Sequence, residues 1–142
     1  MNKDLHNLID NTVSACQDLQ TPCVLEIDSW NQVVMPVKQA LEDMGYFVAQ
    51  IDKAPIRNKD ELLYALDKAC NFPDYFGFNW DALEDSLTDF YWQPAKGYAL
   101  MLGSFGHLQS NDSKTFMEIV QNVCITWAHR GIPFKLLIPQ ID

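Results

Sequence analysis

The stretch FPDYFGFNWDALEDSLTDF, residues 72–90, predicts a turn followed by a short helix. Pro73 and Asp74 are typical of a turn, where proline presets the backbone and aspartate bonds to the main chain. Asn79 is a favoured N-cap residue, so we expect the helix to begin near Trp80.

The predicted helix has one apolar side and one acidic side. Leu83, Leu87 and Phe90 form a stripe at helical spacing that can dock on a core. Asp81 and Asp85 stand four residues apart on another face, where their charges repel by about 0.2–0.5 kcal/mol. The helix therefore displays carboxylates while its apolar residues anchor it.

Two interpretations of the acidic face are open. Acids in the first turns of a helix favour its dipole, and any solvated helix has a charged outer side. Selection for stability alone would more readily place a lysine four residues after Asp81, however, and aromatic residues beside unpaired acids are common in recognition surfaces. The aromatic residues just before and at the start of the helix are Tyr75, Phe76, Phe78 and Trp80.

The same segment resembles the signature of the barstar family, the intracellular inhibitors of the secreted ribonuclease barnase. The matching residues are Pro73, Asp74, Tyr75, Phe76, Gly77, Asn79, Asp81, Ala82, Leu83, Asp85, Leu87 and Thr88. Weaker similarity extends from about Phe47 to Ile138, and it leaves the first 45 or so residues outside.

This resemblance implies a partner-binding site. Asp85 would be the central group, taking the place of a substrate phosphate in a ribonuclease active site, with Asp81 and Asn79 beside it. Tyr75 and the backbone of Gly77 would complete its surroundings. The full set of expected contact residues is Tyr75, Phe76, Gly77, Phe78, Asn79, Trp80, Asp81, Glu84, Asp85 and Thr88.

Three positions depart from the family pattern. Glu84 stands between the two helix aspartates where the archetype has a tryptophan, and Phe78 stands where it has a glutamate. The acid that the archetype contributes from its last helix would fall near Thr126, which cannot replace it. Together with the N-terminal extension, these differences favour a cognate nuclease other than barnase.

The composition indicates one globular domain, residues 1–142, with 48% hydrophobic and 20% charged residues. No apolar run is long enough to span a membrane, and the N-terminus lacks the apolar core of a signal peptide, so we expect a cytoplasmic protein. Ten basic and nineteen acidic residues give a net charge of −9. That charge repels nucleic acid and anionic lipid and suits a basic protein partner.

We expect neither a metal site nor a cofactor. The cysteines Cys16, Cys23, Cys70 and Cys124 form no CxxC pattern, and the histidines show no i, i+4 pair. All four cysteines are therefore interpreted as reduced thiols. Cys70 and Cys124 lie in apolar helical segments, where a free cysteine behaves as a small buried hydrophobe.

The remaining pattern alternates strands with helices. Helices are expected at residues 5–19, 29–44, 58–69 and 110–131, and strands at 23–28, 46–52, 98–103 and 133–139. We expect Ser29 and Asn58 to cap their helices, Pro36 to kink or delay the second helix, and Gly45 to end it.

Such alternation implies an α/β fold whose strands pair in parallel through right-handed crossovers. The barstar fold has three parallel strands with helices packed around them. Residues 1–45 then add a βα unit to a family core of about residues 46–139, which makes four strands in all with the added strand at one edge.

An enzymatic site fits these residues poorly. The paired carboxylates of glycosidases usually face each other across a cleft, whereas Asp81 and Asp85 are neighbours on one helix. Two or three oxygens are too few for calcium. The segment LGSFGHL at residues 102–108, with Ser104 and His107, is not the G-x-S-x-G elbow of serine hydrolases.

Our leading hypothesis is a non-enzymatic inhibitor or immunity protein. Its acidic helix would plug the active site of a basic ribonuclease or nuclease toxin by mimicking RNA phosphate, and it would act as a monomer in the complex. The alternative is a barstar-like adaptor that inhibits nothing and binds another basic protein or a second copy of itself.

Overall fold

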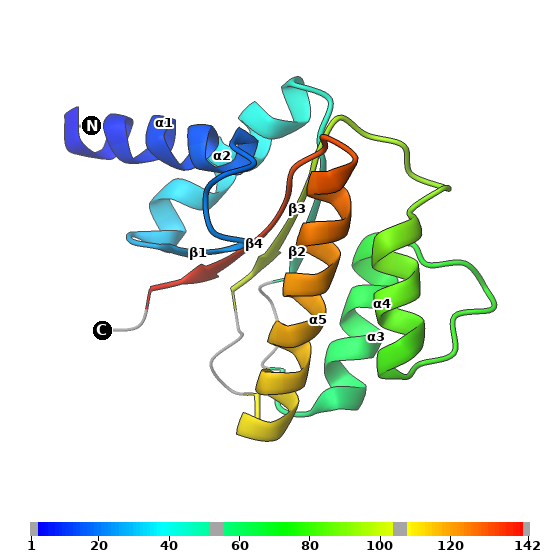
Figure 1. The fold of residues 1–142 in the computed structure, drawn as a ribbon. Coiled ribbons are helices and arrows are strands. Elements are labelled where there is room, and N and C mark those ends of the chain that lie inside the picture. The colour runs from blue at the N-terminus through cyan, green and yellow to red at the C-terminus, as the bar shows by residue number, and fades with distance from the viewer. Residues whose placement is uncertain (1–2, 52–55, 104–107, 141–142) are drawn as a thin grey trace.

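A four-stranded parallel sheet with helices on both faces forms the protein in the computed structural model, which describes residues 3–51, 56–103 and 108–140 (Figure 1). The elements in chain order are α1 (Lys3–Gln17), β1 (Val24–Ile27), α2 (Trp30–Asp43), β2 (Phe47–Ile51), α3 (Lys59–Cys70), α4 (Trp80–Asp89), β3 (Tyr98–Leu102), α5 (Ser110–His129) and β4 (Phe134–Pro139). The predicted α/β class and the four strands are confirmed.

The strand order across the sheet is β1-β4-β3-β2, and every neighbouring pair is parallel. β1, which comes from the first 45 residues, lies at one edge beside β4, as expected for an added strand. β3 and β4 lie in the middle and are almost entirely buried, which explains why their sequences are continuous apolar runs.

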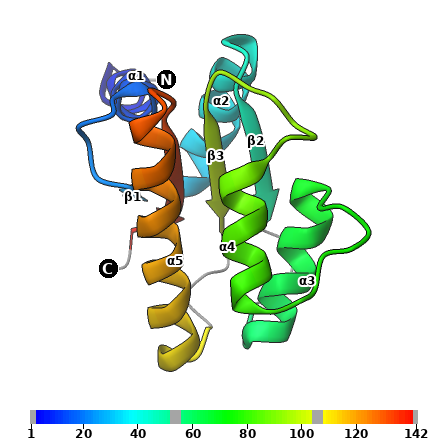
Figure 2. The same ribbon diagram turned by 45° about the vertical axis from the view of Figure 1, so that its right-hand side comes forward.

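Alternate residues of the strands point into two cores on opposite faces of the sheet. In β3, Tyr98, Leu100 and Leu102 belong to the core beneath α3, α4 and α5, whereas Ala99 and Met101 belong to the core beneath α1 and α2. Figures 1 and 2 show this separation of the helices. The acidic helix α4 therefore lies on the face opposite α1.

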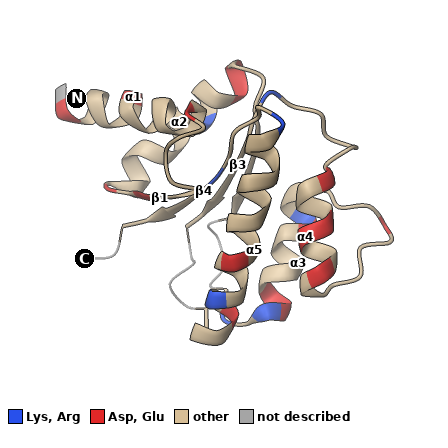
Figure 3. Cartoon of the chain, in the orientation of Figure 1, with Lys and Arg blue, Asp and Glu red and all other residues tan. Residues whose placement is uncertain are grey.

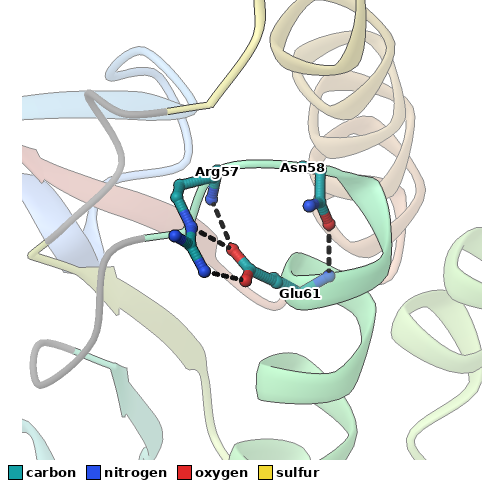
Figure 4. Close-up of polar contacts among 3 residues, drawn as sticks. All are labelled: Arg57, Asn58 and Glu61. Atoms are coloured by element: carbon teal, nitrogen blue, oxygen red, sulfur yellow. Dashed lines mark hydrogen bonds and ion pairs between the residues drawn. The ribbon is translucent and has the colours of Figure 1, made fainter.

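The start of α3 shows how local sequence fixes a helix in this fold (Figure 4). The side-chain oxygen of Asn58 accepts a hydrogen bond from the backbone N–H of Glu61 at 2.9 Å, so the predicted cap is confirmed. The carboxylate of Glu61 in turn accepts bonds from the backbone and the guanidinium of Arg57. This exchange raises the pKa of Arg57 and lowers that of Glu61, mainly through the side-chain hydrogen bond.

The second helix differs in detail from its prediction. Ser29 precedes α2 with a left-handed backbone (φ 58°) and makes no side-chain cap bond. Its carbonyl oxygen instead accepts the backbone N–H groups of Gln32 and Val33. Pro36 does not delay the helix, which begins at Trp30, because it lies on the exposed side where water can bond the carbonyl that it leaves free.

The prediction that all four cysteines are reduced is wrong for one pair. Cys23 and Cys124 form a disulfide that links the chain just before β1 to α5, with Cα atoms 6.0 Å apart. The two residues are 101 positions apart in sequence, and only the packing of α5 over the sheet brings them together. Cys16 and Cys70 are free and buried, and burial raises the pKa of both thiols, that of Cys16 to about 12.

Within the described ranges, no helix is long and apolar enough to cross a membrane. The same residues contain no cluster of three or more side chains suited to a metal ion. Ser104 and His107 of the glycine-containing segment lie outside the described residues.

Candidate functional site

Helix α4 is fixed on the protein by its apolar side. Leu83, Leu87 and Phe90 are buried, as the helical spacing predicts. The ring of Phe90 stacks on Tyr98 of β3, with ring centres 4.8 Å apart and planes within 13° of parallel. The helix thus rests on the centre of the sheet.

Both ends of α4 are also held by hydrogen bonds. At its start, the side-chain oxygen of Asn79 accepts the backbone N–H of Ala82 at 2.8 Å, which confirms the predicted cap. At its end, the indole N–H of Trp127 donates to the carbonyl of Leu87 at 2.8 Å, and Arg130 donates to that of Thr88 at 2.6 Å. Side chains of α5 and the residue after it therefore satisfy carbonyls that a helix end leaves open, and the acidic side is presented on a rigid support.

The acidic side chains of α4 are not used in structural ion pairs of the described residues. Asp81, Asp85 and Asp89 are exposed and Glu84 is half-buried, and none of the four forms an ion pair within the part of the chain that the structure describes. In Figure 3, α4 carries stretches coloured red for Asp and Glu and none coloured blue for Lys and Arg. Asp89 is the last residue of the helix, where a negative charge opposes the helix dipole at a cost of about 0.3–1 kcal/mol. Stability of the isolated protein does not account for this placement.

The loop before α4 is anchored by two of its phenylalanines and exposes a third. Phe72 and Phe76 are buried with ring centres 4.6 Å apart. Phe76, expected as a contact residue, therefore has its ring in the core, where it supports the loop. Phe78 is 47% exposed and has a left-handed backbone with φ 52°, a conformation that costs a bulky residue about 1–3 kcal/mol.

The other expected contact residues occupy varied positions around α4. Tyr75 is 73% exposed, whereas Trp80 is half-buried against the core. Gly77 is exposed, and a Cβ atom there would lie 3.2 Å from the amide nitrogen of Asn79. The hydroxyl of Thr88 is turned back onto the helix and donates to the carbonyl of Glu84 at 2.8 Å. The structure thus places the carboxylates, Tyr75 and Phe78 outward and uses Asn79 for capping.

Sequence reasoning missed Tyr91, which directly follows the last turn of α4. This side chain is 58% exposed, and its hydroxyl lies 3.2 Å from that of Tyr75. The only signal in the sequence is an aromatic residue next to Phe90, and no periodic pattern connects positions 75 and 91. The loop before α4 has to fold back along the helix before the two hydroxyls can meet.

This surface is chemically suited to binding cations. Carboxylates on one rigid helix, flanked by exposed aromatic rings, match the ammonium and guanidinium groups of a basic protein. Two hollows of the molecule lie elsewhere: one is lined by residues around the Cys23–Cys124 disulfide, and the other runs along β1 and α1. Neither is lined by α4, so the acids do not face one another across either hollow.

Comparison with families of known proteins gives one finding for this chain. Residues 46–139 match the family described as barstar (barnase inhibitor). The match covers well over half of the chain, begins just before β2 and ends at the last residue of β4. Comparison with curated proteins finds no match.

Proposed function

This chain belongs to the barstar family, whose members are protein inhibitors of ribonuclease, and we propose that it inhibits a cognate basic ribonuclease or nuclease toxin by covering the active site with α4 and the loop before it. In this proposal the protein is an immunity protein that acts in the cytoplasm of the cell that makes it. It has no catalytic residues of its own and binds protein, not nucleic acid.

The proposed mechanism is mimicry of RNA phosphate. Asp85, with Asp81 one turn away, takes the position of phosphate groups and receives hydrogen bonds from the arginine, lysine or histidine side chains that hold RNA. Hydrogen bonds between ionised groups are shorter and about twice as strong as neutral ones. The net charge of −9 draws a basic enzyme toward the inhibitor before contact.

The observation that carries the proposal is the set of exposed acids on α4 that have no ion-pair partner among the described residues. These charges repel one another in the free protein, and the dipole of α4 opposes the last of them. A basic active site would relieve both costs on binding. The helix needs little ordering to bind, because its two ends are already held.

Phe78 and Glu84 support a partner other than barnase. Phe78 exposes an aromatic ring on a left-handed backbone where the archetype has a carboxylate, and Glu84 adds a charge where it has an indole. A pocket shaped for the archetype would therefore meet the wrong group at both positions. We propose that the cognate enzyme has an apolar patch opposite Phe78 and a basic residue opposite Glu84.

The test is a titration of ribonuclease activity with the purified protein. The enzyme is the ribonuclease toxin encoded beside this gene or, where there is none, barnase. Stoichiometric inhibition is expected, with an association rate that falls steeply as the salt concentration rises because the steering is electrostatic. Full activity of the neighbouring toxin at a large excess of the protein would contradict the proposal and favour the adaptor hypothesis, whereas full activity of barnase alone would show only that the partner is another enzyme.

A further inference from the structure

The exposed aromatic side chains of the described residues are concentrated around the acidic helix. They are Tyr64, Tyr75, Phe78 and Tyr91. Phe78 belongs to the surface already described, and the ammonium group of Lys68 covers the ring of Tyr64 at 5.4 Å from its centre. Tyr75 and Tyr91 remain as a pair at the end of α4.

Neighbouring residues fix the position of the Tyr75–Tyr91 pair. The two hydroxyl oxygens lie 3.2 Å apart and join the loop before α4 to the segment after it. The ring of Tyr91 packs edge-on against Trp92 at 5.1 Å, and the indole N–H of Trp92 donates to the carbonyl of Cys70 at 3.1 Å. Trp92 also packs against the buried ring of Phe72. Two exposed rings are thus fixed by contacts that reach the core.

Asp89 supplies a negative charge beside this pair. The hydrogen bond with Tyr91 raises the pKa of Tyr75, and the charge of Asp89 raises it further. The hydroxyl of Tyr75 therefore stays neutral at physiological pH. Asp89 ends α4, which has no basic residue in its last turn. Arg130 already donates to the carbonyl of Thr88 at this helix end, but the carboxylate of Asp89 forms no ion pair among the described residues and favours a further cation here.

We propose that Tyr75, Tyr91 and Asp89 form a second contact of the inhibitor, which receives an arginine side chain of the ribonuclease. The guanidinium group stacks on a tyrosine ring and pairs with the carboxylate of Asp89. This inference rests on the proposed function, and it extends the interface from the acidic face of α4 to the segment that follows the helix.

Arginine fits this contact better than other partner groups. Its planar guanidinium group stacks on aromatic faces and bonds a carboxylate at its edge, whereas the compact ammonium of lysine is more strongly hydrated. A phosphate or an anionic lipid would be repelled by Asp89 and by the acids of α4. The cluster therefore selects which basic enzyme the inhibitor accepts.

The test compares variants in binding to the ribonuclease used for the inhibition titration. Tyr91→Ala is expected to weaken binding about tenfold, mainly through faster dissociation. Asp89→Asn is expected to weaken it several-fold, and Tyr91→Phe, which keeps the ring, by about twofold or less. Tyr64→Ala removes an exposed tyrosine from α3 and should leave the affinity unchanged, as a matched control.

A double variant identifies the partner group. If Tyr91 and Asp89 hold the same arginine, the loss in Tyr91→Ala/Asp89→Asn is smaller than the product of the single losses. One arginine of the ribonuclease, changed to alanine, should likewise remove the effect of Tyr91→Ala. Thermal unfolding of each variant shows whether it is folded, and Tyr91→Leu, which keeps much of the side-chain volume but has no aromatic face, serves if Tyr91→Ala is not.

The outcomes separate the two proposals. If the wild-type protein inhibits and Tyr91→Ala binds as tightly as Tyr64→Ala, the arginine contact is overturned and the inhibitor function stands. Independent effects of Tyr91 and Asp89, with no arginine of the enzyme coupled to either, also overturn it. Failure of the wild-type protein to inhibit the neighbouring toxin would overturn both.

Discussion

Asn79 links local sequence to the proposed binding surface, because it caps the helix that carries the acids. Replacing it with alanine removes the hydrogen bond that its side-chain oxygen accepts from the backbone N–H of Ala82. We predict that Asn79→Ala lowers the free energy of unfolding by about 1 kcal/mol, measured by urea denaturation. Asn79→Asp keeps a capping oxygen and should stay close to the wild-type stability. Equal stability of Asn79→Ala and wild type would show that the cap is dispensable.

We predict that Cys16 lowers the free energy of unfolding at alkaline pH. Burial raises its pKa from the ordinary 9.0 to about 12, so the thiol is protonated in both folded and unfolded chains below pH 9. Above pH 9 the unfolded chain loses this proton first, and the free energy of unfolding falls as the pH rises toward 12. Between about pH 8 and about pH 10, Cys16 should account for a loss of about 1.4 kcal/mol.

Urea denaturation at the two pH values checks this loss. Cys16→Ala removes the titrating group, so its free energy of unfolding should fall by about 1.4 kcal/mol less than that of wild type over the same interval. The variant will be less stable at neutral pH because it leaves a cavity, but only the difference between the two pH values matters here. Parallel curves for the two proteins would contradict the burial of this thiol.

The residues of the site differ in how far the sequence reveals them. The cap at Asn79 and the pair Asp81 and Asp85 could be predicted, because residues three or four positions apart are neighbours on a helix. Asn79 bonds the backbone three residues on, and Asp81 and Asp85 share one face. The burial of Phe76 could not be predicted, because either side of the turn could have faced the core. The meeting of Tyr75 and Tyr91 depends on how the loop packs along α4, and that information is not local.

At the level of the elements, the disulfide is a covalent link, in addition to the peptide backbone, between the N-terminal unit and the family core. It joins the chain before β1 to α5 and closes a loop across 101 positions of sequence. A loop of that length implies about 4–5 kcal/mol of stability from restriction of the unfolded chain. We predict that reduction with dithiothreitol lowers the free energy of unfolding by an amount of this order.

Urea denaturation with and without the reductant measures this effect. The variant Cys23→Ala/Cys124→Ala provides the control, since its stability should not respond to dithiothreitol, whereas Cys16 and Cys70 remain free in both proteins. A wild-type protein that is equally stable under both conditions would mean that the disulfide does not form in solution.

The elements themselves were largely predictable, and their arrangement was less so. Alternation of strands and helices indicates a parallel sheet, and the apolar runs of β3 and β4 indicate strands buried on both faces. The strand order β1-β4-β3-β2 was not predictable in the same way, because it depends on which strand each crossover returns to. The cysteine pair was missed because it depends on the packing of α5 over that sheet.

In the whole molecule, the sheet separates two groups of helices, one on each face. α3, α4 and α5 lie over one face, where α4 carries the proposed binding surface, while α1 and α2 cover the other. Negative charge is present on both faces, so net charge alone would steer a basic enzyme without deciding where it docks (Figure 3). In the proposed function, tight inhibition depends on specific contacts at α4, and this distinction allows a direct test.

The decisive measurement is the inhibition constant of Asp81→Ala/Asp85→Ala compared with Asp4→Ala/Asp10→Ala against the ribonuclease used for the titration. Each variant loses two exposed carboxylates from one helix, the first from α4 and the second from α1 on the opposite face. We predict that the α4 variant loses inhibition by at least about a thousandfold, because charge pairs at the centre of an interface contribute several kcal/mol. The α1 variant should inhibit nearly as well as wild type. Equal inhibition by the two variants would contradict the assignment of α4 as the inhibitory element.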